Sequence, residues 1–342
     1  MSTRALVVGG TGPTGVHIVD FLLSADHEVT VFSSGAHDEG AHFAGPVQRI
    51  YGNARDEESV RATIGQREWD VAICTYGRLR MLADVLAGRT GRFVGITGQP
   101  VYRGAARRTP DGGIALPVPE QAERQYDAAD YTGQVAKGED QLFAQHDRGD
   151  FQAVVVRYPG VYGPRAPVNH EWAVVKRVLD RRPLMLMPHD GLSYFQRGYS
   201  ENVAWLVALC ATRPEASGQA FNAGDEQVLS ARRVAEVITD ELGWEMEFVG
   251  VPADLVRGVY PLAEKAPLIL DMAKARSLLG YRDRVPVEEA TRRTARWLAE
   301  HPPREDDLAI GARIPSDVYE VEDRIARAWR AAEAQARAAL AS

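Results

Sequence analysis

The stretch that decides the fold is ALVVGGTGPTGVHIVDFLL, residues 5–23, where an apolar run passes through spaced glycines into a helix-like segment. Glycine at such positions permits a tight turn, lets the backbone approach a pyrophosphate, and leaves helix N–H groups directed at the anion. A glycine-rich turn without a ligand is the alternative. Because a strand-like run precedes the glycines and a helical pattern follows them, we predict a dinucleotide-binding loop formed by Gly9, Thr11, Gly12, Pro13, Thr14 and Gly15.

Apolar strand-like runs alternate with helix-like stretches over the first half of the chain. The predicted strands are Ala5–Val8, Val29–Phe32, Val47–Tyr51, Val71–Thr75, Phe93–Thr97 and Ala153–Arg157. The predicted helices are Val16–Leu23, Glu57–Ile64, Leu79–Ala87 and Gly133–Gln145. This alternation predicts an α/β fold with a Rossmann-type, doubly wound parallel sheet, whose ligand lies beyond the carboxyl ends of the strands.

The second half of the chain has a looser pattern with many Pro and Gly turns. We expect the dinucleotide-binding domain mainly in residues 1–160. We expect a smaller C-terminal substrate-binding region in 161–300, which can return strands to the sheet. A linker with a helical extension follows in 301–342. We expect this added C-terminal helix to pack on its own body or on a second subunit, with a lid over the substrate as the alternative. Its apolar stripe at helical spacing consists of Val318, Val321, Ile325, Ala328, Trp329 and Ala332.

Composition restricts the class of protein. The chain has 342 residues and a formal net charge of -7, which disfavours nucleic acid or an anionic membrane as the main partner. No apolar stretch approaches the roughly 20 residues of a membrane helix, and the first strand begins too early for a signal peptide, so we expect a cytoplasmic protein. Cys74 and Cys210 lie in separate apolar segments as packing thiols, and no metal-ligand spacing occurs.

Several short motifs occur in one order along the chain, and together they resemble the extended short-chain dehydrogenase/reductases, the NAD-dependent epimerase/dehydratase family. The resemblance covers roughly residues 1–300. The matching pieces are Gly9–Gly15, Phe93–Tyr102, Lys137 with Glu139, Arg157-Tyr158-Pro159, Val161–Pro164, Phe221–Gly224 and Leu278–Tyr281.

The resemblance implies a catalytic triad that this chain carries only in part. In the family, a tyrosine four residues before a lysine exchanges a proton with the substrate, the lysine holds the nicotinamide ribose, and a Ser or Thr hydroxyl binds the same substrate oxygen. Lys137 matches the lysine, whereas Gly133 and Gly98 stand at the tyrosine and Ser/Thr positions. The candidate replacements are Tyr131, Thr97 and Tyr102; proton transfer through water or the substrate itself is another route. A shifted alignment that gives Tyr131 the tyrosine's role restores ordinary reductase chemistry.

The resemblance also bears on the cofactor. NAD-specific members end the second strand with an acidic residue, whereas this chain has Ser33 and Ser34 there, with no acid before Asp38. The sequence therefore favours NADP(H), with NAD(H) as the alternative. Asn53 stands where an aspartate usually meets adenine, and its side-chain oxygen can still accept a hydrogen bond. Lys137 and Tyr158 complete the predicted cofactor contacts.

Two family contacts to nucleotide sugars are missing, since Gly160 and Phe195 stand at the Asn and Arg positions that hold them. We therefore expect a less charged substrate, and the two triad glycines enlarge the space for it. His170 titrates near neutrality and is a candidate acid or base, or else an ordinary surface histidine. The candidate substrate residues are Gly98, Gly133, Tyr162, Arg165, His170, Trp172 and Phe195.

The sequence thus favours an NAD(P)-dependent oxidoreductase or epimerase that acts on a small, non-nucleotide-sugar metabolite, and we expect a role in specialised metabolism. Two alternatives remain. One is an isomerase, cyclase or lyase without net redox chemistry, and the other is a non-catalytic NAD(P)-binding sensor. By the family resemblance we expect a homodimer that uses helices such as Leu79–Ala87 and Gly133–Gln145.

Overall fold

The computed structural model describes residues 3–36, 38–75, 78–105, 114–126, 131–256, 258–304 and 313–341. The chain divides into two compact units. Unit 1 comprises Met1–Val161, Gln196–Glu226 and Leu268–Val285, and unit 2 comprises Tyr162–Phe195, Gln227–Pro267 and Pro286–Ser342. The N-terminal segment of unit 1 ends next to the boundary expected at residue 160, and two later segments of the chain return to this unit.

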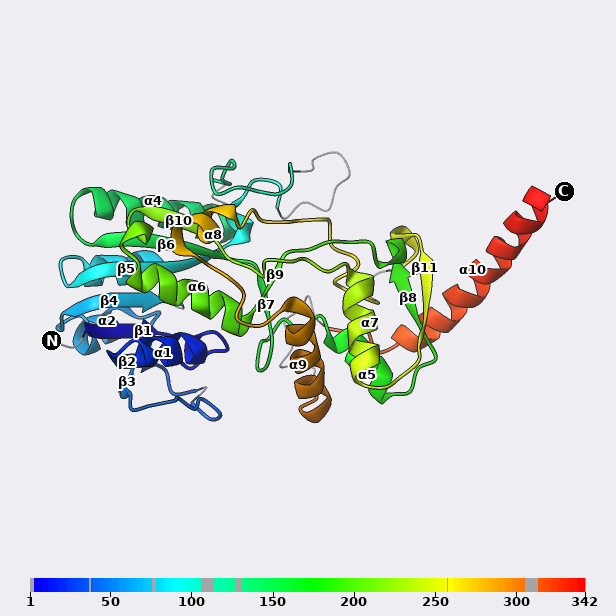
Figure 1. Cartoon of the computed structure of the whole chain (residues 1–342), viewed down its shortest axis with the longest axis horizontal. Coiled ribbons are helices and arrows are strands. Elements are labelled where there is room, and N and C mark those ends of the chain that lie inside the picture. Colours follow the sequence, from blue (N-terminus) through cyan, green and yellow to red (C-terminus); the bar gives the residue numbers. More distant parts are fainter. Residues whose placement is uncertain are drawn as a thin grey trace. The chain divides into compact units, whose positions relative to one another are not determined.

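Unit 1 is built on a seven-stranded sheet with the order β10-β6-β5-β4-β1-β2-β3 (Figure 1). All neighbouring strands in it run parallel. The predicted Rossmann-type α/β fold is confirmed, and β10 is a strand that returns from the later part of the chain. The strands are β1 (Thr3–Val8), β2 (His27–Ser33), β3 (Gln48–Tyr51), β4 (Trp69–Cys74), β5 (Thr90–Gly98), β6 (Gln152–Tyr158) and β10 (Gln219–Asn222).

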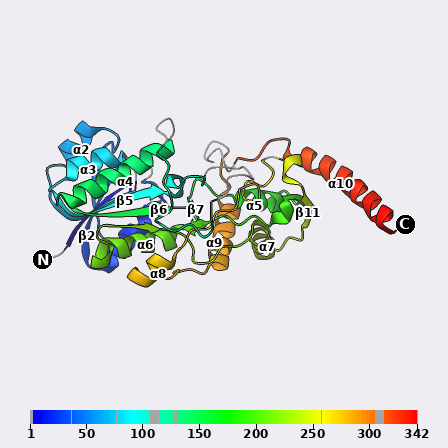
Figure 2. The same cartoon turned by 90° about the horizontal axis from the view of Figure 1, so that it is seen from above.

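Helices cover both faces of this sheet, because side chains alternate between the faces along each buried strand. In β1, Ala5 and Val7 pack with α1 (Gly15–Ser24), α6 (Ser200–Thr212) and α8 (Ala273–Leu279). Leu6 and Val8 pack with α2 (Glu57–Thr63), α3 (Leu79–Leu86) and α4 (Tyr131–Asp147). Figure 2 shows α2, α3 and α4 on one side of the sheet and α6 and α8 on the other.

Short elements connect these layers. A two-stranded ladder joins β7 (Gly160–Tyr162) to β9 (Arg197–Tyr199). Single 3-10 turns occur at η1 (Gln99–Val101), η2 (His189–Gly191), η3 (Pro214–Ala216) and η4 (Ala253–Leu255).

Unit 2 has its own small sheet, in which β8 (Leu184–Pro188) pairs in parallel with β11 (Glu247–Val251). The core on one side includes Met185 and Met187 with α5 (Trp172–Leu179), α7 (Ala231–Glu241) and α9 (Val287–Glu300). On the other side, Leu186 and Val249 pack against α10 (Val318–Ala341). The expected C-terminal helix is therefore present, and its first turns dock on unit 2.

A buried ion pair holds α10 in place. The Glu322 carboxylate accepts hydrogen bonds from the Arg177 guanidinium and from the Leu186 backbone N–H, and both charged side chains are fully buried. From residue 330 onward α10 is exposed and extends beyond β8 and β11 (Figure 1). Of the predicted apolar stripe, Val318 is buried whereas Ala328 and Ala332 are exposed, because the docked face centres on Glu322 and Ala326.

Candidate active site

The predicted dinucleotide loop lies between the carboxyl end of β1 and the start of α1. Gly9 has a φ of +85°, a backbone conformation that favours glycine, and its N–H donates to Phe32 O at 3.0 Å. A Cβ at Gly15 would lie 2.4 Å from Gly9 O, so this position accepts no side chain without movement of the backbone. A Cβ at Gly12 would lie 3.5 Å from Gly9 O, its nearest neighbour, so this side of the loop is open. These features fit a loop that receives a pyrophosphate.

The side chains around the loop are well packed. Thr11 and Thr14 are buried, and Pro13 is half-buried. Tyr158 ends β6 and packs against the core cluster on the α1 side of the sheet, where burial raises the pKa of its hydroxyl. At the adenine end, Asn53 Oδ1 accepts from Arg55 N–H at 3.0 Å and keeps a second lone pair. The predicted cofactor contacts of these side chains stay predictions.

A buried ionic network joins α4 to the carboxyl ends of β5 and β6. The Glu139 side chain is fully buried and accepts from Arg157 Nε at 3.0 Å, from Arg157 Nη2 at 2.7 Å and from Thr97 Oγ1 at 2.8 Å. Burial lowers the pKa of Arg157, but the hydrogen bonds to Glu139 and the charge of Glu139 raise it above its usual value. Arg124 Nη1 adds a further contact to Glu139 at 3.3 Å. The network fixes which face of α4 is turned toward the strands.

Tyr102 belongs to the same network. Its hydroxyl accepts from Arg157 Nη1 at 2.9 Å and donates to Asn222 Oδ1, which links β10 to the cluster. Burial raises the pKa of Tyr102 to about 12. The hydroxyls of Thr97 and Tyr102 are thus engaged in buried hydrogen bonds, and the catalytic roles suggested for them stay predictions that this engagement disfavours.

The helix α4 carries the remaining catalytic candidates. It begins at Tyr131, whose side chain lies outside the described part of the structure. Residues 131 and 135 precede Glu139 by eight and four positions and share its side of the helix, and Val135 is buried there. Lys137 lies two residues from Glu139, which is about 200° around the helix. Its predicted hold on the nicotinamide ribose stays a prediction, and the orientation of α4 argues against it.

The two triad glycines differ in their surroundings. Gly98 ends β5, and a Cβ there would lie 3.1 Å from Pro100 Cδ. Gly133 is buried in the first turn of α4, two residues from Val135 and about 200° around the helix from it. By the orientation of α4, position 133 is therefore not on the side that faces the strands.

The candidate substrate residues from Tyr162 onward belong to unit 2. Tyr162 is fully buried, and Arg165 adopts a positive φ of +64° in the following turn. His170 is 3% exposed, so it is not a surface histidine. Trp172 is buried in the α5–α7–α9 core, and Phe195 packs against that core with Lys265 Nζ 4.8 Å from its ring centre. Packing accounts for both aromatic residues, and their contact with a substrate stays a prediction.

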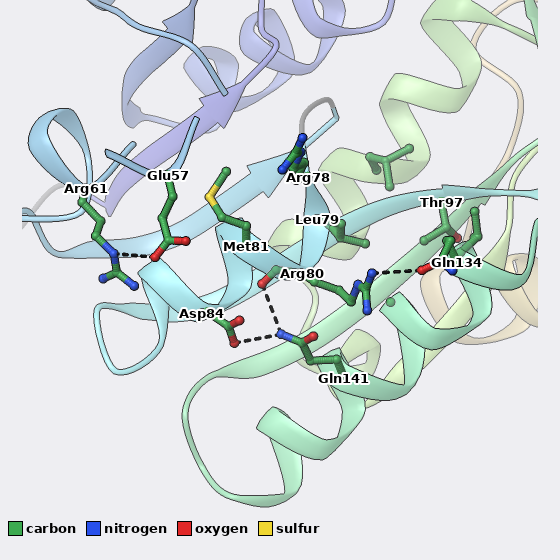
Figure 3. Close-up of a pocket in the computed structure, with 13 residues that line it drawn as sticks. Glu57, Arg61, Arg78, Leu79, Arg80, Met81, Asp84, Thr97, Gln134 and Gln141 are labelled. Atoms are coloured by element: carbon green, nitrogen blue, oxygen red, sulfur yellow. Dashed lines mark hydrogen bonds and ion pairs between the residues drawn. The ribbon is translucent and has the colours of Figure 1, made fainter. Parts of the chain in front are cut away.

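A cavity of about 700 Å³ opens among α2, α3 and α4 (Figure 3). Thr97 and Val135 contribute to its wall. Polar side chains on its rim hydrogen-bond to one another, as the dashed lines in Figure 3 show. The pairs are Arg61 with Glu57 at 2.9 Å, Arg80 with Gln134 at 3.0 Å and Gln141 with Asp84 at 2.8 Å. The glycine loop is not part of its lining, and the cavity lies on the face of the sheet that α2, α3 and α4 cover.

Sequence reasoning missed the network's key pair, although Arg157 and Glu139 were both in matched motifs. The signal was available: Arg157 directly follows Ala153–Val156 in a buried strand, and an arginine at such a position needs a buried carboxylate. The contributions of Arg124 and Asn222 come from distant segments and carry no local signal. Among the described residues, no group of His, Cys, Asp or Glu is arranged to hold a metal ion, and no helix is long and apolar enough to span a membrane.

Residues 5–81, which run from β1 to the start of α3, match the family described as NAD dependent epimerase/dehydratase. Over this segment, the chain is similar to the NAD-dependent epimerase/dehydratase family. The resemblance predicted from the sequence is confirmed.

Two relatives illustrate how far the likeness extends. A UDP-N-acetyl-alpha-D-glucosaminuronate decarboxylase from Bacillus cytotoxicus is 22% identical over 332 residues, which cover 88% of this chain and 99% of that protein. The uncharacterized protein YbjS of Escherichia coli K12 is 24% identical over 173 residues, or 43% of this chain and 50% of YbjS. The chain therefore spans half the length of YbjS in this match.

Solved structures of two enzymes share the fold. The UDP-glucose 4-epimerase of Thermotoga maritima, solved with UDP-glucose, has a TM-score of 0.70 at 18% identity and covers 87% of this chain and 99% of its own. The Bordetella bronchiseptica enzyme WbmG, solved with NAD, has a TM-score of 0.68 at 17% identity, with coverage of 88% and 95%. At these identities the likeness establishes the fold.

Proposed function

We propose that this chain is an NAD(P)-dependent enzyme of the epimerase/dehydratase type that acts on a small organic substrate. The observation that carries the proposal is the glycine loop: the backbone of Gly9 and Gly10 leaves no room for a side chain at Gly15, while the side of the loop at Gly12 is open. A loop of this shape at a helix N-terminus suits a pyrophosphate. A bound nicotinamide cofactor would supply acceptance and return of a hydride.

The chain's own residues would position the reaction and move its proton. The Glu139–Arg157 pair orients α4 against the ends of β5 and β6. Position 131 lies on that side of α4 and carries a tyrosine, and the buried Val135 stands where a lysine would follow that tyrosine by four residues. We therefore assign the acid–base role to Tyr131, which corresponds to the shifted alignment rather than to Gly133 and Lys137.

The substrate we propose is less charged than a nucleotide sugar. Gly160 offers no side chain to bind one, and Phe195 presents an apolar ring that packs in unit 2. The decarboxylase and the UDP-glucose 4-epimerase are named for UDP-sugars, so UDP-sugars are the rival class. Chromatographic analysis of the products formed from uncharged hydroxy compounds and from UDP-sugars, in the presence of the dinucleotide, separates the two; turnover of UDP-sugars alone would refute the first.

The first experiment is equilibrium dialysis of the full chain with NAD, NADH, NADP and NADPH. Saturable binding of at least one is expected, and Gly12→Ala should weaken it because the added methyl group lies on the open side of the loop. No binding of any of the four would overturn the proposal. Binding without any turnover would favour the cofactor-binding sensor, and turnover without net redox change would favour the isomerase or lyase alternative.

The acid–base assignment has its own test once a turnover assay exists. Tyr131→Phe should lower kcat by about 100-fold or more while cofactor affinity holds, since loss of a general acid–base group typically costs about 10²–10⁴-fold. Tyr126→Phe is the matched control, because Tyr126 is an exposed tyrosine whose hydroxyl bonds Asp140. Equal kcat values for the two variants would contradict the assignment.

We further propose that two copies of the chain associate through α3 and α4. These helices flank the cavity of Figure 3, and Arg80 and Gln141 are among the residues that line it. Sedimentation equilibrium of the full chain should give the mass of a dimer, and the proposal fails if it gives that of a monomer.

A further inference from the structure

Two segments of unit 1 are tied together where the chain leaves this unit. The chain passes into unit 2 after Glu226 and again after Val285. Close to these points, Glu226 N–H donates to Asp283 Oδ2 at 2.9 Å, and Asp283 N–H donates to Glu226 Oε2 at 3.0 Å. Each carboxyl group therefore binds the backbone of the other segment. We call this reciprocal pair the Glu226–Asp283 clasp.

The start of α6 holds the same two segments through a neutral side chain. Asn202 Nδ2 donates to Asp225 Oδ1 and to Val285 O, both at 2.9 Å. Asn202 Oδ1 accepts from the N–H groups of Arg284 and Val285, both at 2.9 Å. Tyr199 N–H also donates to Asp225 Oδ1 at 2.9 Å. Because the amide of Asn202 does not titrate, a change of pH acts on these segments through the carboxyl groups of the cluster.

The Tyr281 hydroxyl links the clasp to the protonation of Asp283. Its oxygen lies 2.9 Å from Asp283 Oδ1 and 3.0 Å from Gly224 O. A hydroxyl donates one proton, so Tyr281 donates to an ionised Asp283 or to Gly224 O and not to both. When Asp283 carries a proton and donates it to the Tyr281 oxygen, Tyr281 donates to Gly224 O and both contacts are hydrogen bonds. The geometry is therefore fully satisfied only with a protonated Asp283.

Negative charge around the clasp also favours the proton. Burial and the charge of Asp225 raise the pKa of Asp283 to about 7, with a smaller contribution from the Glu226 charge. The hydrogen bonds from Glu226 N–H and Tyr281 oppose this shift in pKa without cancelling it. Asp225 is almost fully buried, so water screens its charge poorly.

The cations near the clasp have other contacts. Arg282 lies 3.9 Å from Glu226 and is exposed, and the Arg284 guanidinium lies over the rings of Trp205 and Phe21. Further charged residues on the adjoining elements are Arg197 in β9, Glu201 in α6, and Lys274 and Arg276 in α8.

We propose that the Glu226–Asp283 clasp is a pH-sensitive switch, closed while Asp283 carries a proton and opened by the loss of that proton, which frees the segments that end at Glu226 and Val285. An open clasp exposes Asp283 to water, where the pKa of its carboxyl returns from about 7 to 3.8. Between these values the closed form binds more protons than the open form. Opening should therefore increase by up to about tenfold per pH unit from about pH 4 to about pH 7 and level off above.

Hydrogen–deuterium exchange of the full chain without ligand tests the switch. In the wild type, the protection factors of the Glu226 and Asp283 amides should fall by about tenfold or more between about pH 5 and pH 7. In Asp283→Asn they should change by less than about threefold, because the amide side chain does not ionise. Asp70→Asn is the matched control, since Asp70 is an exposed aspartate that pairs with Arg4, and it should behave as the wild type does.

A second variant keeps Asp283 in place. Asp225→Asn retains an oxygen that can accept from Tyr199 and Asn202 but removes the neighbouring charge, so the pKa of Asp283 should fall. The loss of protection between pH 5 and pH 7 should then be smaller than in the wild type. This variant decides the question if Asp283→Asn does not fold.

Two results would overturn the proposal. One is an equal loss of protection in the wild type and Asp283→Asn. The other is equal protection, at both pH values, of the clasp amides and the amides of Val71–Ile73 in the central strand β4, because exchange would then occur only through unfolding of the whole unit. Neither result bears on dinucleotide binding, since no ligand is present in the experiment.

Discussion

Asp283 lies in a buried carboxyl cluster of unit 1. It accepts from Tyr281 OH and from Glu226 N–H, both at 2.9 Å, and burial together with the nearby Asp225 raises its pKa from 3.8 to about 7. Between these two values the folded chain retains a proton that the unfolded chain releases, so stability falls as the pH rises from about 4 to about 7.

Asp283→Asn should remove this part of the pH dependence, because the amide carries no charge at any pH. Relative to the wild type, the variant should gain stability between pH 5 and pH 8, a window that follows from the raised pKa. Urea denaturation at both pH values measures the difference. Asp70→Asn, an exposed aspartate paired with Arg4, should give a difference that stays constant. A constant difference for Asp283→Asn as well would contradict the prediction.

Lys137 offers a direct check on the orientation of α4. Because it lies about 200° around the helix from Glu139, Lys137→Ala should change the dissociation constant of the bound dinucleotide by less than about threefold, well below the effect of a lost charged hydrogen bond. Gly12→Ala serves as the positive control in the same titration. A loss of tenfold or more in Lys137→Ala would restore the ribose-holding role that the sequence suggests for this lysine.

At the scale of elements, we expect one glycine of the loop, Gly15, to affect stability and another, Gly12, to affect dinucleotide binding. Gly15→Ala places a methyl group against the backbone of Gly9 and Gly10, at 2.4 and 2.7 Å, so it should destabilise unit 1 by about 1–3 kcal/mol. Gly12→Ala meets Gly9 O at 3.5 Å and should leave stability unchanged while it weakens dinucleotide binding. Denaturant midpoints together with calorimetric titration measure both effects, and equal stability of the two variants would show that the loop adjusts.

The attachment of α10 depends on one buried ion pair. Glu322→Gln leaves the Arg177 charge buried without its counter-ion, which should cost about 3–5 kcal/mol of stability in unit 2. Asp323→Asn is the neighbouring control, since Asp323 is 41% exposed in its pair with Arg182 and should cost less than about 1 kcal/mol. Chemical denaturation followed by near-UV circular dichroism measures both. Similar midpoints for the two variants would mean that α10 docks through its apolar contacts alone.

At the scale of the whole molecule, the predictable parts are those with a local signal. The strands and the glycine loop follow from hydrophobic periodicity and closely spaced glycines, and the structure contains all six predicted strands. Asp38 was noted in the sequence as the first acid after the second strand. Its hydrogen bond with Ser33 could not be predicted, because Tyr51 and Arg49 of the neighbouring strand also hold its carboxylate. Lys137 was placed by its spacing from matched motifs, whereas the orientation of α4 is set by the contact of Glu139 with Arg157.

Long-range contacts also decide which polar residues are buried. His170 follows a Pro/Gly turn and reads as a surface histidine, but the fold buries it at the start of α5. Glu322 interrupts the apolar stripe of α10, and it is the centre of the docked face because Arg177 lies opposite. Composition and periodicity describe single segments and hold no information on such pairings.

The division into units has a consequence for synthesis on the ribosome. The chain passes from one unit to the other after Val161, Phe195, Glu226, Pro267 and Val285. When residue 161 emerges, β6 is an open edge of the sheet, and its neighbour β10 follows only after α5 and β8 of unit 2 have been made. An open strand edge invites pairing with other chains. A nascent chain is therefore exposed to aggregation over this interval. The last segment of unit 1 is translated only after two segments of unit 2 have been made.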